Sequence, residues 1–317
     1  MIRLGLIGCG EHEEIGHAIP LARYLAAHPD QIELTAACDV QIPRAQNFCS
    51  KYGFKSAYCS ANEMLRQTKL DGCIAVVPPE YIAEVGANLL RSSIPSVVEK
   101  PLGTSLAEVA FLLDAAKTTG TRNMVSVNRR FMPFLNRAFE WARSIGPLRY
   151  VRCTMTRHAR KEPEFLSTTA IHAVDALRYI AGEVSESSVR TMKIDDGASW
   201  HGIDLRFKSG VYGRIDVLPT TATVEETYEL FGENFQATVT SPFGVQRSVR
   251  CFQNKKLVLE EIAGNDMPED VVNGGYAEAE EFIRALSQGD APRPSIEEVA
   301  PSVTLCLMMA KNMKGTE

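Results

Sequence analysis

The chain has 317 residues, about twice the ~150 residues that serve as a guide for one domain, so we expect two domains. Its composition, with 45% hydrophobic and 23% charged residues, excludes a collagen, a disordered tail and a mini-protein. The 34 basic and 39 acidic side chains give a net charge of −5, and no basic block could follow a nucleic-acid backbone. We therefore expect no nucleic-acid partner.

The charge is unevenly distributed along the chain. Residues 1–125 carry a net charge of −2, residues 126–181 carry +6 and residues 182–317 carry −9. A strongly positive stretch can focus the electric field and favour an anionic ligand. The alternative is a solvated basic face paired with acidic neighbours, and the sequence leaves both interpretations open.

The cysteines and the apolar runs indicate the compartment. Eight cysteines are scattered without a Cys-x-x-Cys pair, several of them inside apolar runs, so neither a disulfide framework nor a zinc site is expected. The apolar run at 2–7 is too short for a signal peptide, and no run reaches the ~18 residues of a membrane span. We expect a cytoplasmic protein that makes no membrane contact.

The first 127 residues alternate short apolar runs with helical patterns, which is typical of parallel βαβ units. Ser60 with Glu63, and Ser105 with Glu108, form capping boxes that mark two helix starts. The pattern predicts a doubly wound parallel sheet. The predicted strands are 2–7, 32–38, 72–77, 96–98 and 123–127, and the predicted helices lie near 17–28, 43–51, 60–67, 80–92 and 105–118.

The pattern then changes to alternating runs without intervening helices, which indicates an antiparallel or mixed sheet. We therefore divide the chain into a first domain at 1–125 and a second at 126–317. The predicted elements of the second domain are a strand at 149–158, a helix at 167–181 ended by Gly182, several strands within 186–260, and helices at 274–288 and 296–312.

Gly8-Cys9-Gly10 lies between the first strand and a helix, where two glycines let the backbone turn tightly and approach a pyrophosphate. The third glycine of a GxGxxG motif would fall at Glu13, and the next glycine is Gly16, so we expect a longer loop than usual. The loop carries Glu11, Glu13 and Glu14, which would repel a pyrophosphate unless they point to solvent. These carboxylates count partly against a dinucleotide site.

Asp39 ends the second strand, a little beyond the ~20 residues that usually separate the glycines from an acidic residue. A carboxylate there accepts hydrogen bonds from ribose hydroxyls and repels a 2′-phosphate, which favours NAD over NADP. A helix-capping aspartate in a cofactor-free α/β fold is the alternative.

The segment from His12 to His17 resembles the zinc motif HExxH. The two histidines are five residues apart, which places them about 140° apart on an α-helix, so we expect no metal site here. We expect His12 to lie in a loop and His17 to lie at the start of a helix.

Glu99-Lys100-Pro101 places a lysine at the carboxyl end of a parallel strand, where open α/β sheets bind ligands. A desolvated lysine close to a positive nicotinamide would have a lowered pKa, which suits proton transfer or a contact with a substrate hydroxyl. A surface lysine is the alternative interpretation.

These pieces, in this order, resemble the Gfo/Idh/MocA oxidoreductases, which are NAD(P)-dependent sugar and polyol dehydrogenases. The resemblance covers nearly the whole chain. It implies a Rossmann domain followed by an α+β domain with a large open, mostly antiparallel sheet, and a terminal helix, 296–312, that packs back on the first domain. The motifs that carry it are Gly8-Cys9-Gly10, Val77-Pro78-Pro79, Glu99-Lys100-Pro101, the segment 127–133 and the segment 170–179.

The resemblance also implies site residues. Lys100 and His172 match the lysine and histidine that face the nicotinamide from the two domains of family members. The family's aspartate four residues before the histidine is Thr168 here, and Asp175 is expected to be structural. Thr168 can hydrogen-bond a substrate hydroxyl but supplies no negative charge. The residues expected near the cofactor are Gly8, Cys9, Gly10, Glu11, His12, Asp39, Val77, Pro78, Glu99, Lys100 and Asn128.

Chemistry supports a base at His172, because alcohol oxidation needs a group that takes the hydroxyl proton while hydride leaves. A buried histidine in a fold that has lost activity is the alternative. The basic side chains of Arg129, Arg157 and Arg160 are candidates to bind a carboxylate, a phosphate or an acidic sugar. An exposed strand end and a loop are the alternative for these arginines.

The sequence therefore predicts an NAD-dependent oxidoreductase for a sugar, polyol or related, possibly acidic, small molecule. The resemblance also implies a homodimer or homotetramer formed through the sheet of the second domain. The competing hypothesis is a non-catalytic ligand sensor or regulatory scaffold, supported by Thr168 and by the acidic phosphate loop. A hydrolase or lyase that holds NAD tightly is a third alternative.

Overall fold

The protein's structure, a computed structural model, describes residues 1–194 and 197–314. The chain forms two compact units, one made of Met1–Val127 with Gly275–Thr304 and the other of Asn128–Gly274 with the residues from Leu305 onward. The sequence-based division at residue 125 differs from this at the C-terminal end, because it assigns residues 275–304 to the second domain. Helix α11 (Gly275–Gln288) accounts for part of the difference, since it packs on β1 and on α2 of the first unit.

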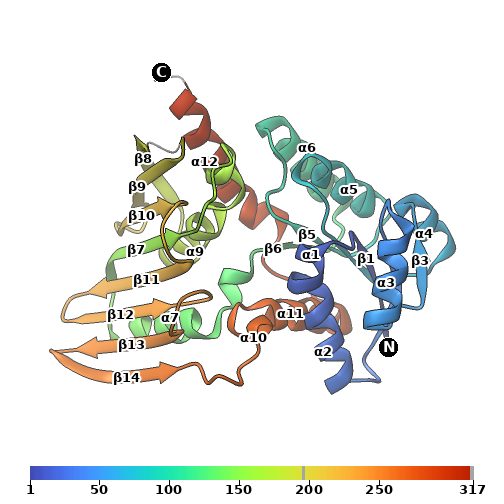
Figure 1. The fold of residues 1–317 in the computed structure, drawn as a ribbon, viewed down its shortest axis with the longest axis horizontal. Helices are drawn as coiled ribbons and strands as arrows, with labels where there is room; N and C mark the ends of the chain where they lie inside the picture. Colours follow the sequence, from blue (N-terminus) through green and yellow to red (C-terminus); the bar gives the residue numbers. More distant parts are fainter. Residues whose placement is uncertain (195–196, 315–317) are drawn as a thin grey trace. The chain divides into compact units, whose positions relative to one another are not determined.

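The first unit contains one parallel sheet with the strand order β3-β2-β1-β4-β5-β6 (Figure 1). Chain order reverses between β1 and β4, and ligands of such sheets bind outside the carboxyl ends of the strands at this point. The predicted doubly wound sheet is confirmed, with one additional strand, β3. The strands are β1 (Ile2–Ile7), β2 (Ile32–Cys38), β3 (Ser56–Tyr58), β4 (Gly72–Ala75), β5 (Ser96–Glu99) and β6 (Asn123–Ser126).

The helices of the first unit begin where local signals place them. Ser60 and Ser105 accept hydrogen bonds from the backbone N–H of Glu63 and Glu108, as the capping boxes predict. Gly53 and Gly120 end their helices in the left-handed conformation. The helices are α1 (Glu11–Glu13), a π-turn (Glu14–Ala18), α2 (Ile19–Ala27), α3 (Ile42–Tyr52), α4 (Ala61–Gln67), α5 (Pro79–Arg91) and α6 (Leu106–Thr119).

The second unit contains an eight-stranded sheet with the order β14-β13-β12-β11-β7-β10-β9-β8. Only β7 and β10 pair in parallel among these neighbours, so the predicted mostly antiparallel sheet is confirmed. The strands are β7 (Leu148–Thr156), β8 (Val184–Lys193), β9 (Ser199–Phe207), β10 (Tyr212–Leu218), β11 (Glu225–Gly232), β12 (Phe235–Thr240), β13 (Ser248–Gln253) and β14 (Lys256–Ile262).

Helices α7 and α9 pack against this sheet, α7 on β11 to β13 and α9 on β7 and β10. The helix predicted at 167–181 is two helices, α8 and α9, separated at residues 169–170. None of the helices in the described part of the chain is long and apolar enough to span a membrane. The remaining helices are a 3₁₀ turn (Asn128–Phe131), α7 (Pro133–Ile145), α8 (Phe165–Thr168), α9 (Ile171–Ala181), α10 (Glu269–Val272) and α12 (Ile296–Lys314).

Candidate functional site

The turn after β1 accepts only glycine at its first position. Gly8 has φ of +97°, and a Cβ atom built on it would lie 1.8 Å from the carbonyl oxygen of Val76, the residue after β4. The Gly8 N–H donates to the carbonyl of Cys38 at 2.8 Å, which ties the turn to the end of β2. The backbone therefore follows the carboxyl edge of the sheet closely, as a phosphate-binding turn requires.

Asp39 is held by the same turn. Its Oδ2 accepts a hydrogen bond from the Cys9 N–H at 2.9 Å, and its Oδ1 accepts one from the Gln41 N–H at 2.8 Å. Burial and the neighbouring Asp39 charge raise the pKa of the Cys9 thiol, so Cys9 is a protonated wall residue and not a nucleophile. The structure thus brings the two glycines and Asp39 together at one edge of the sheet.

The expected long loop after Gly10 is not present. Helical structure begins at Glu11, directly after Gly10, and continues to Ala27 through a π-turn at Glu14–Ala18. In this turn the Ile19 N–H donates to the Glu14 carbonyl, five residues back, and the next residue, Pro20, has no N–H to donate. The residues expected in a loop are therefore helical, including His12.

The π-turn also changes the relation between His12 and His17. The predicted separation of about 140° holds for an α-helix, but residues five apart lie on one face of a π-turn. Both imidazoles reach the carboxylate of Glu99, His17 Nε2 at 3.2 Å from Oε2 and His12 Nε2 at 3.6 Å from Oε1. The assumption of α-helical geometry was wrong here, and His17 is a buried residue of the π-turn instead of a helix start.

The three glutamates of this segment have different surroundings. Glu14 pairs with Lys51 and accepts a hydrogen bond from the hydroxyl of Tyr52, and these contacts lower its pKa. Glu11 is exposed. Glu13 lies over the glycines, because its Oε2 is 2.6 Å from where a Cβ on Gly10 would be. Of these three glutamates, Glu13 is therefore the one whose carboxylate lies against the glycine turn.

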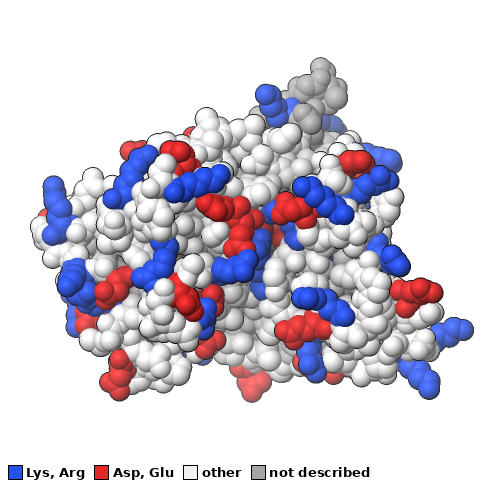
Figure 2. Space-filling model, turned by 180° about the vertical axis from the view of Figure 1, so that it is seen from behind, with Lys and Arg blue, Asp and Glu red and all other residues white. Residues whose placement is uncertain are grey.

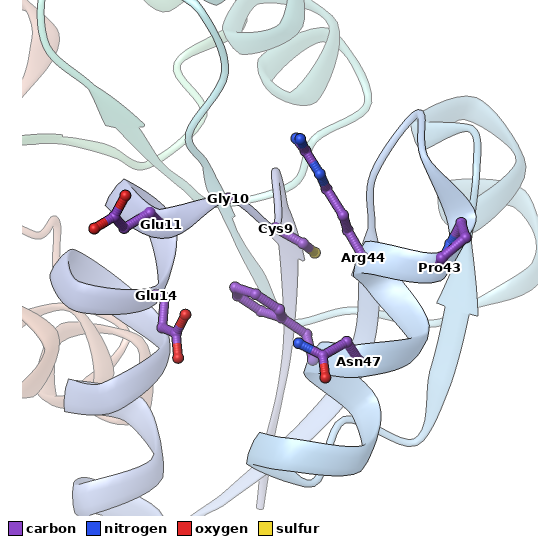
Figure 3. A pocket seen from close by; sticks show the side chains of 8 residues that line it. Cys9, Gly10, Glu11, Glu14, Pro43, Arg44 and Asn47 are labelled. Atoms are coloured by element: carbon purple, nitrogen blue, oxygen red, sulfur yellow. The ribbon is translucent and has the colours of Figure 1, made fainter.

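A pocket of about 440 Å³ adjoins the turn. Figure 3 shows Glu11 and Glu14 on one side, α3 side chains on the other, and Cys9 and Gly10 between them. Arg44 and Phe48 of α3 belong to its lining. Val77 and Pro78 are not part of this lining; they follow β4 and lead into α5.

Glu99 and Lys100 lie at the carboxyl end of β5. Lys100 Nζ is 3.9 Å from Glu99 Oε1, and the two side chains are 14% and 7% exposed. Burial alone would raise the pKa of Glu99, but the contacts with His12 and His17 and the charge of Lys100 lower it well below its ordinary value. Glu99 is therefore a buried carboxylate surrounded by groups that can carry positive charge.

In the second unit, Arg129 and Arg157 share a buried acidic partner. Arg129 donates to Glu226 through Nε at 3.0 Å and Nη2 at 2.7 Å, and Arg157 Nη2 donates to the same carboxylate. Tyr228 donates its hydroxyl to Glu226 at 2.8 Å. Burial would raise the pKa of Glu226, but the charges and hydrogen bonds of the two arginines lower it to about 2. Two of the three predicted anion-binding arginines, Arg129 and Arg157, thus already bind a buried carboxylate of the chain.

Five further basic side chains of the positive stretch pair with acidic side chains, namely Arg130, Arg137, Arg152, Arg160 and Arg178. Arg160 is exposed and pairs with Glu162, and Arg130 binds Asp175 through Nε at 2.7 Å and Nη2 at 2.8 Å. Figure 2 shows Lys and Arg interspersed with Asp and Glu over the visible face, without a continuous basic patch. The structure therefore favours the interpretation of the +6 stretch as paired charges over that of a field-focusing surface.

His172, Thr168 and Asn128 also lie in the second unit. His172 is the second residue of α9, and its N–H donates to the Thr169 carbonyl at 3.2 Å. Thr168 ends α8, and its hydroxyl donates to the Glu164 carbonyl at 2.9 Å. The Asn128 side-chain amide donates to the carbonyl of Asn273 at 3.0 Å.

Residues 2–128 match the model of a family described as an oxidoreductase family with an NAD-binding Rossmann fold, Gfo/Idh/MocA. Residues 2–128 therefore form a Rossmann domain of the Gfo/Idh/MocA type. The predicted resemblance to this family is confirmed for this part of the chain.

Two curated proteins are similar to this chain over longer stretches. It is 25% identical to the rhizopine catabolism protein MocA of Rhizobium meliloti over 190 residues, 57% of each chain. It is 26% identical to a myo-inositol 2-dehydrogenase of Thermotoga maritima over 232 residues, 68% of each chain. The match thus spans less than two thirds of the first relative. A levoglucosan dehydrogenase in complex with NADH has the same fold, with a TM-score of 0.83 at 17% identity over 99% of this chain and 97% of that one.

Sequence reasoning missed two groups of contacts in this protein. Glu226 lies 97 residues from Arg129, and only its position in the acidic last segment was a signal. The contact of Glu99 with His12 and His17 depends on a π-turn. A proline shortly after a helix start, Pro20, was the one available signal of irregular helical hydrogen bonding.

Proposed function

We propose that this chain is an NAD-dependent dehydrogenase that transfers hydride between nicotinamide and a CH–OH carbon of a sugar or polyol. The observation that carries the proposal is the Asp39 carboxylate, held by the Cys9 N–H directly beside the glycine turn. A carboxylate fixed in this position suits the two ribose hydroxyls of adenosine and disfavours a 2′-phosphate. The sugar and polyol substrates named for the relatives support the substrate class.

The residues of the first unit fit a dinucleotide. The Gly8 turn leaves no room for a side chain, so the backbone itself lies where a pyrophosphate approaches. The adjoining pocket, lined by Arg44 and Phe48, has a volume suited to a small organic group. NAD, when bound, supplies the carbon that accepts or gives hydride.

Two side chains of the chain handle the substrate proton in this proposal. His172, whose imidazole can accept and release a proton, takes the proton from the hydroxyl. Lys100 binds the same oxygen and stabilises negative charge that develops on it. Thr168 supplies no charge to this base, and its hydroxyl donates to a backbone carbonyl. We therefore expect either slow turnover or another group that orients His172.

The pairing of the arginines limits which substrate charge this chain can bind. Arg129 and Arg157 bind Glu226, so a contact with an acidic substrate rests on Arg160, which is exposed. A neutral sugar or polyol is therefore the substrate class that we favour.

We also propose that the chain self-associates through its eight-stranded sheet. Light scattering of the purified protein tests whether the chain self-associates.

A second candidate is a sensor or scaffold that binds a ligand without turnover. The Glu13 carboxylate over Gly10 favours it, because it opposes a pyrophosphate at that point. The threonine at position 168, where the family has an aspartate, favours the sensor as well.

Titration with NADH and NADPH, followed by calorimetry, separates these candidates at the first step. We expect NADH to bind more tightly than NADPH, and Asp39→Ala to weaken NADH binding by about tenfold. An absence of NADH binding at millimolar concentration would reject the dehydrogenase. With binding established, a panel of sugars and polyols is tested for NADH formation, and binding without any turnover would support the sensor.

A further inference from the structure

Glu99 is the last residue of β5, and its carboxylate is shared by side chains from two segments of the first unit. His17 Nε2, from the π-turn, lies 3.2 Å from Oε2. On the other oxygen, Oε1, His12 Nε2 lies at 3.6 Å and Lys100 Nζ at 3.9 Å. His12 and Lys100 therefore share one carboxylate oxygen as a counter-charge.

The groups around this oxygen differ in exposure. The side chain of His12 is 63% exposed, whereas those of Lys100 and Glu99 are 14% and 7% exposed. His12 thus exchanges protons with bulk water directly. The contact with Glu99 and the charge of Glu99 raise the pKa of His12, while burial and the charge of Lys100 lower it. Such a coupling acts in both directions, because each charge changes the proton affinity of the other group.

We propose that His12 is a positioning residue for Lys100. Protonation of His12 weakens the pairing between Glu99 and the Lys100 ammonium group. With His12 neutral, the charge on Oε1 acts on Lys100 without competition from a charged His12 and favours the charged form of Lys100. With His12 charged, the oxygen is shared and a second positive charge lies near Lys100, so the neutral amine is favoured. The consequence for turnover rests on the role proposed above for Lys100 at the substrate oxygen.

The other charged groups around His12 do not replace this coupling. Glu13 of the same helical turn raises the pKa of His12 through its charge. His17 occupies the opposite oxygen of Glu99. Substituting His12 therefore leaves Glu99 with His17 on Oε2, and because His12 is largely exposed, the His12→Gln variant is expected to fold normally.

Competitive acetylation of the cofactor-free protein with trace acetic anhydride, read by mass spectrometry of the Lys100 peptide, measures the neutral fraction of Lys100. A lysine that titrates alone changes its reactivity by about tenfold per pH unit below its pKa. In the wild type we expect the reactivity of Lys100 to rise less steeply with pH over the range in which His12 titrates. In His12→Gln we expect no such shallow range. At pH values below that range, the reactivity of Lys100 in His12→Gln should be at least about threefold lower than in the wild type.

A matched control removes a histidine elsewhere in the same unit. His28 follows the end of α2 and stacks on Tyr24, with ring centroids 4.6 Å apart. His28→Gln is expected to keep the wild-type profile of Lys100. Superimposable profiles for wild type and His12→Gln would overturn the proposal.

The reciprocal measurement follows the His12 ring by NMR. The pKa of His12 is expected to rise in Lys100→Met, because a neighbouring positive charge is removed, and an unchanged pKa would overturn the proposal. Both measurements use the protein without cofactor, and NADH binding is measured separately. A wild type that shows the coupling but binds no NADH would reject the proposed function and leave the coupling established.

Discussion

Arg129 and Glu226 form a two-pronged ion pair inside the second unit, with donor–acceptor distances of 3.0 and 2.7 Å. Arg157 donates to the same carboxylate, and the Phe243 ring lies 5.5 Å and 4.9 Å from the guanidinium carbons of Arg129 and Arg157. One carboxylate therefore balances two buried cations and joins the 3₁₀ turn, the end of β7 and β11.

Removing this carboxylate leaves two buried positive charges without their partner. We expect Glu226→Ala to lower the free energy of unfolding by about 3–5 kcal/mol, measured by chemical denaturation. Glu162→Ala is the matched control, because it removes the partner of the exposed Arg160 and is expected to cost about 1 kcal/mol or less. Equal losses for the two variants would contradict the assignment.

The same carboxylate predicts a pH dependence. The pKa of Glu226 is lowered to about 2 from 4.5, so its stabilising contribution is fully present above the unfolded pKa and is lost as the pH falls toward the folded one. The difference in unfolding free energy between wild type and Glu226→Gln is expected to shrink as the pH is lowered from about 5 to about 3. A constant difference across this range would argue against a charged Glu226.

Gly8 and Gly53 provide a matched pair for the turn after β1. Gly8→Ala places a Cβ 1.8 Å from the Val76 carbonyl oxygen, so the turn must move and NADH binding is expected to be lost. Gly53 also has a positive φ, +85°, but a Cβ there meets no atom within 4 Å. Gly53→Ala should cost about 1 kcal/mol of stability and leave NADH binding intact in calorimetry.

Glu13 is predicted to weaken dinucleotide binding through its charge. We expect Glu13→Gln to raise the affinity for NADH by about threefold or more at low salt, and by less at high salt. Glu84→Gln, an exposed glutamate of α5, is the control and should bind NADH like the wild type. An unchanged affinity in Glu13→Gln would show that this carboxylate moves aside without cost.

The features that sequence predicted best are those whose causes are local. The strands 2–7 and 32–38 were predicted to the residue, because apolar runs bounded by polar residues specify buried parallel strands. Ser60 and Ser105 mark helix starts through contacts three residues away. β3 has only three residues of intermediate burial, which is too short for a hydrophobic pattern.

The candidate site was predicted in part for the same reason. Gly8 and Asp39 each follow a parallel strand, so the sheet itself brings them to one edge. The pairing of Arg129 with Glu226, and of Glu99 with His17, joins residues 97 and 82 positions apart, and no local pattern specifies such contacts. Charge counted along the chain therefore overstated the free positive charge of the middle segment.

The π-turn at Glu14–Ala18 sets the helical phase of everything before it. Deleting Ile15, an exposed residue of this turn, would restore α-helical spacing and rotate the preceding turn by about 100° relative to α2. His12 would then no longer face Glu99, although no side chain at the carboxylate had been changed. A one-residue difference in length at this point would therefore divide otherwise similar chains into two groups. In one group a histidine shares Oε1 of Glu99 with Lys100, and in the other it does not.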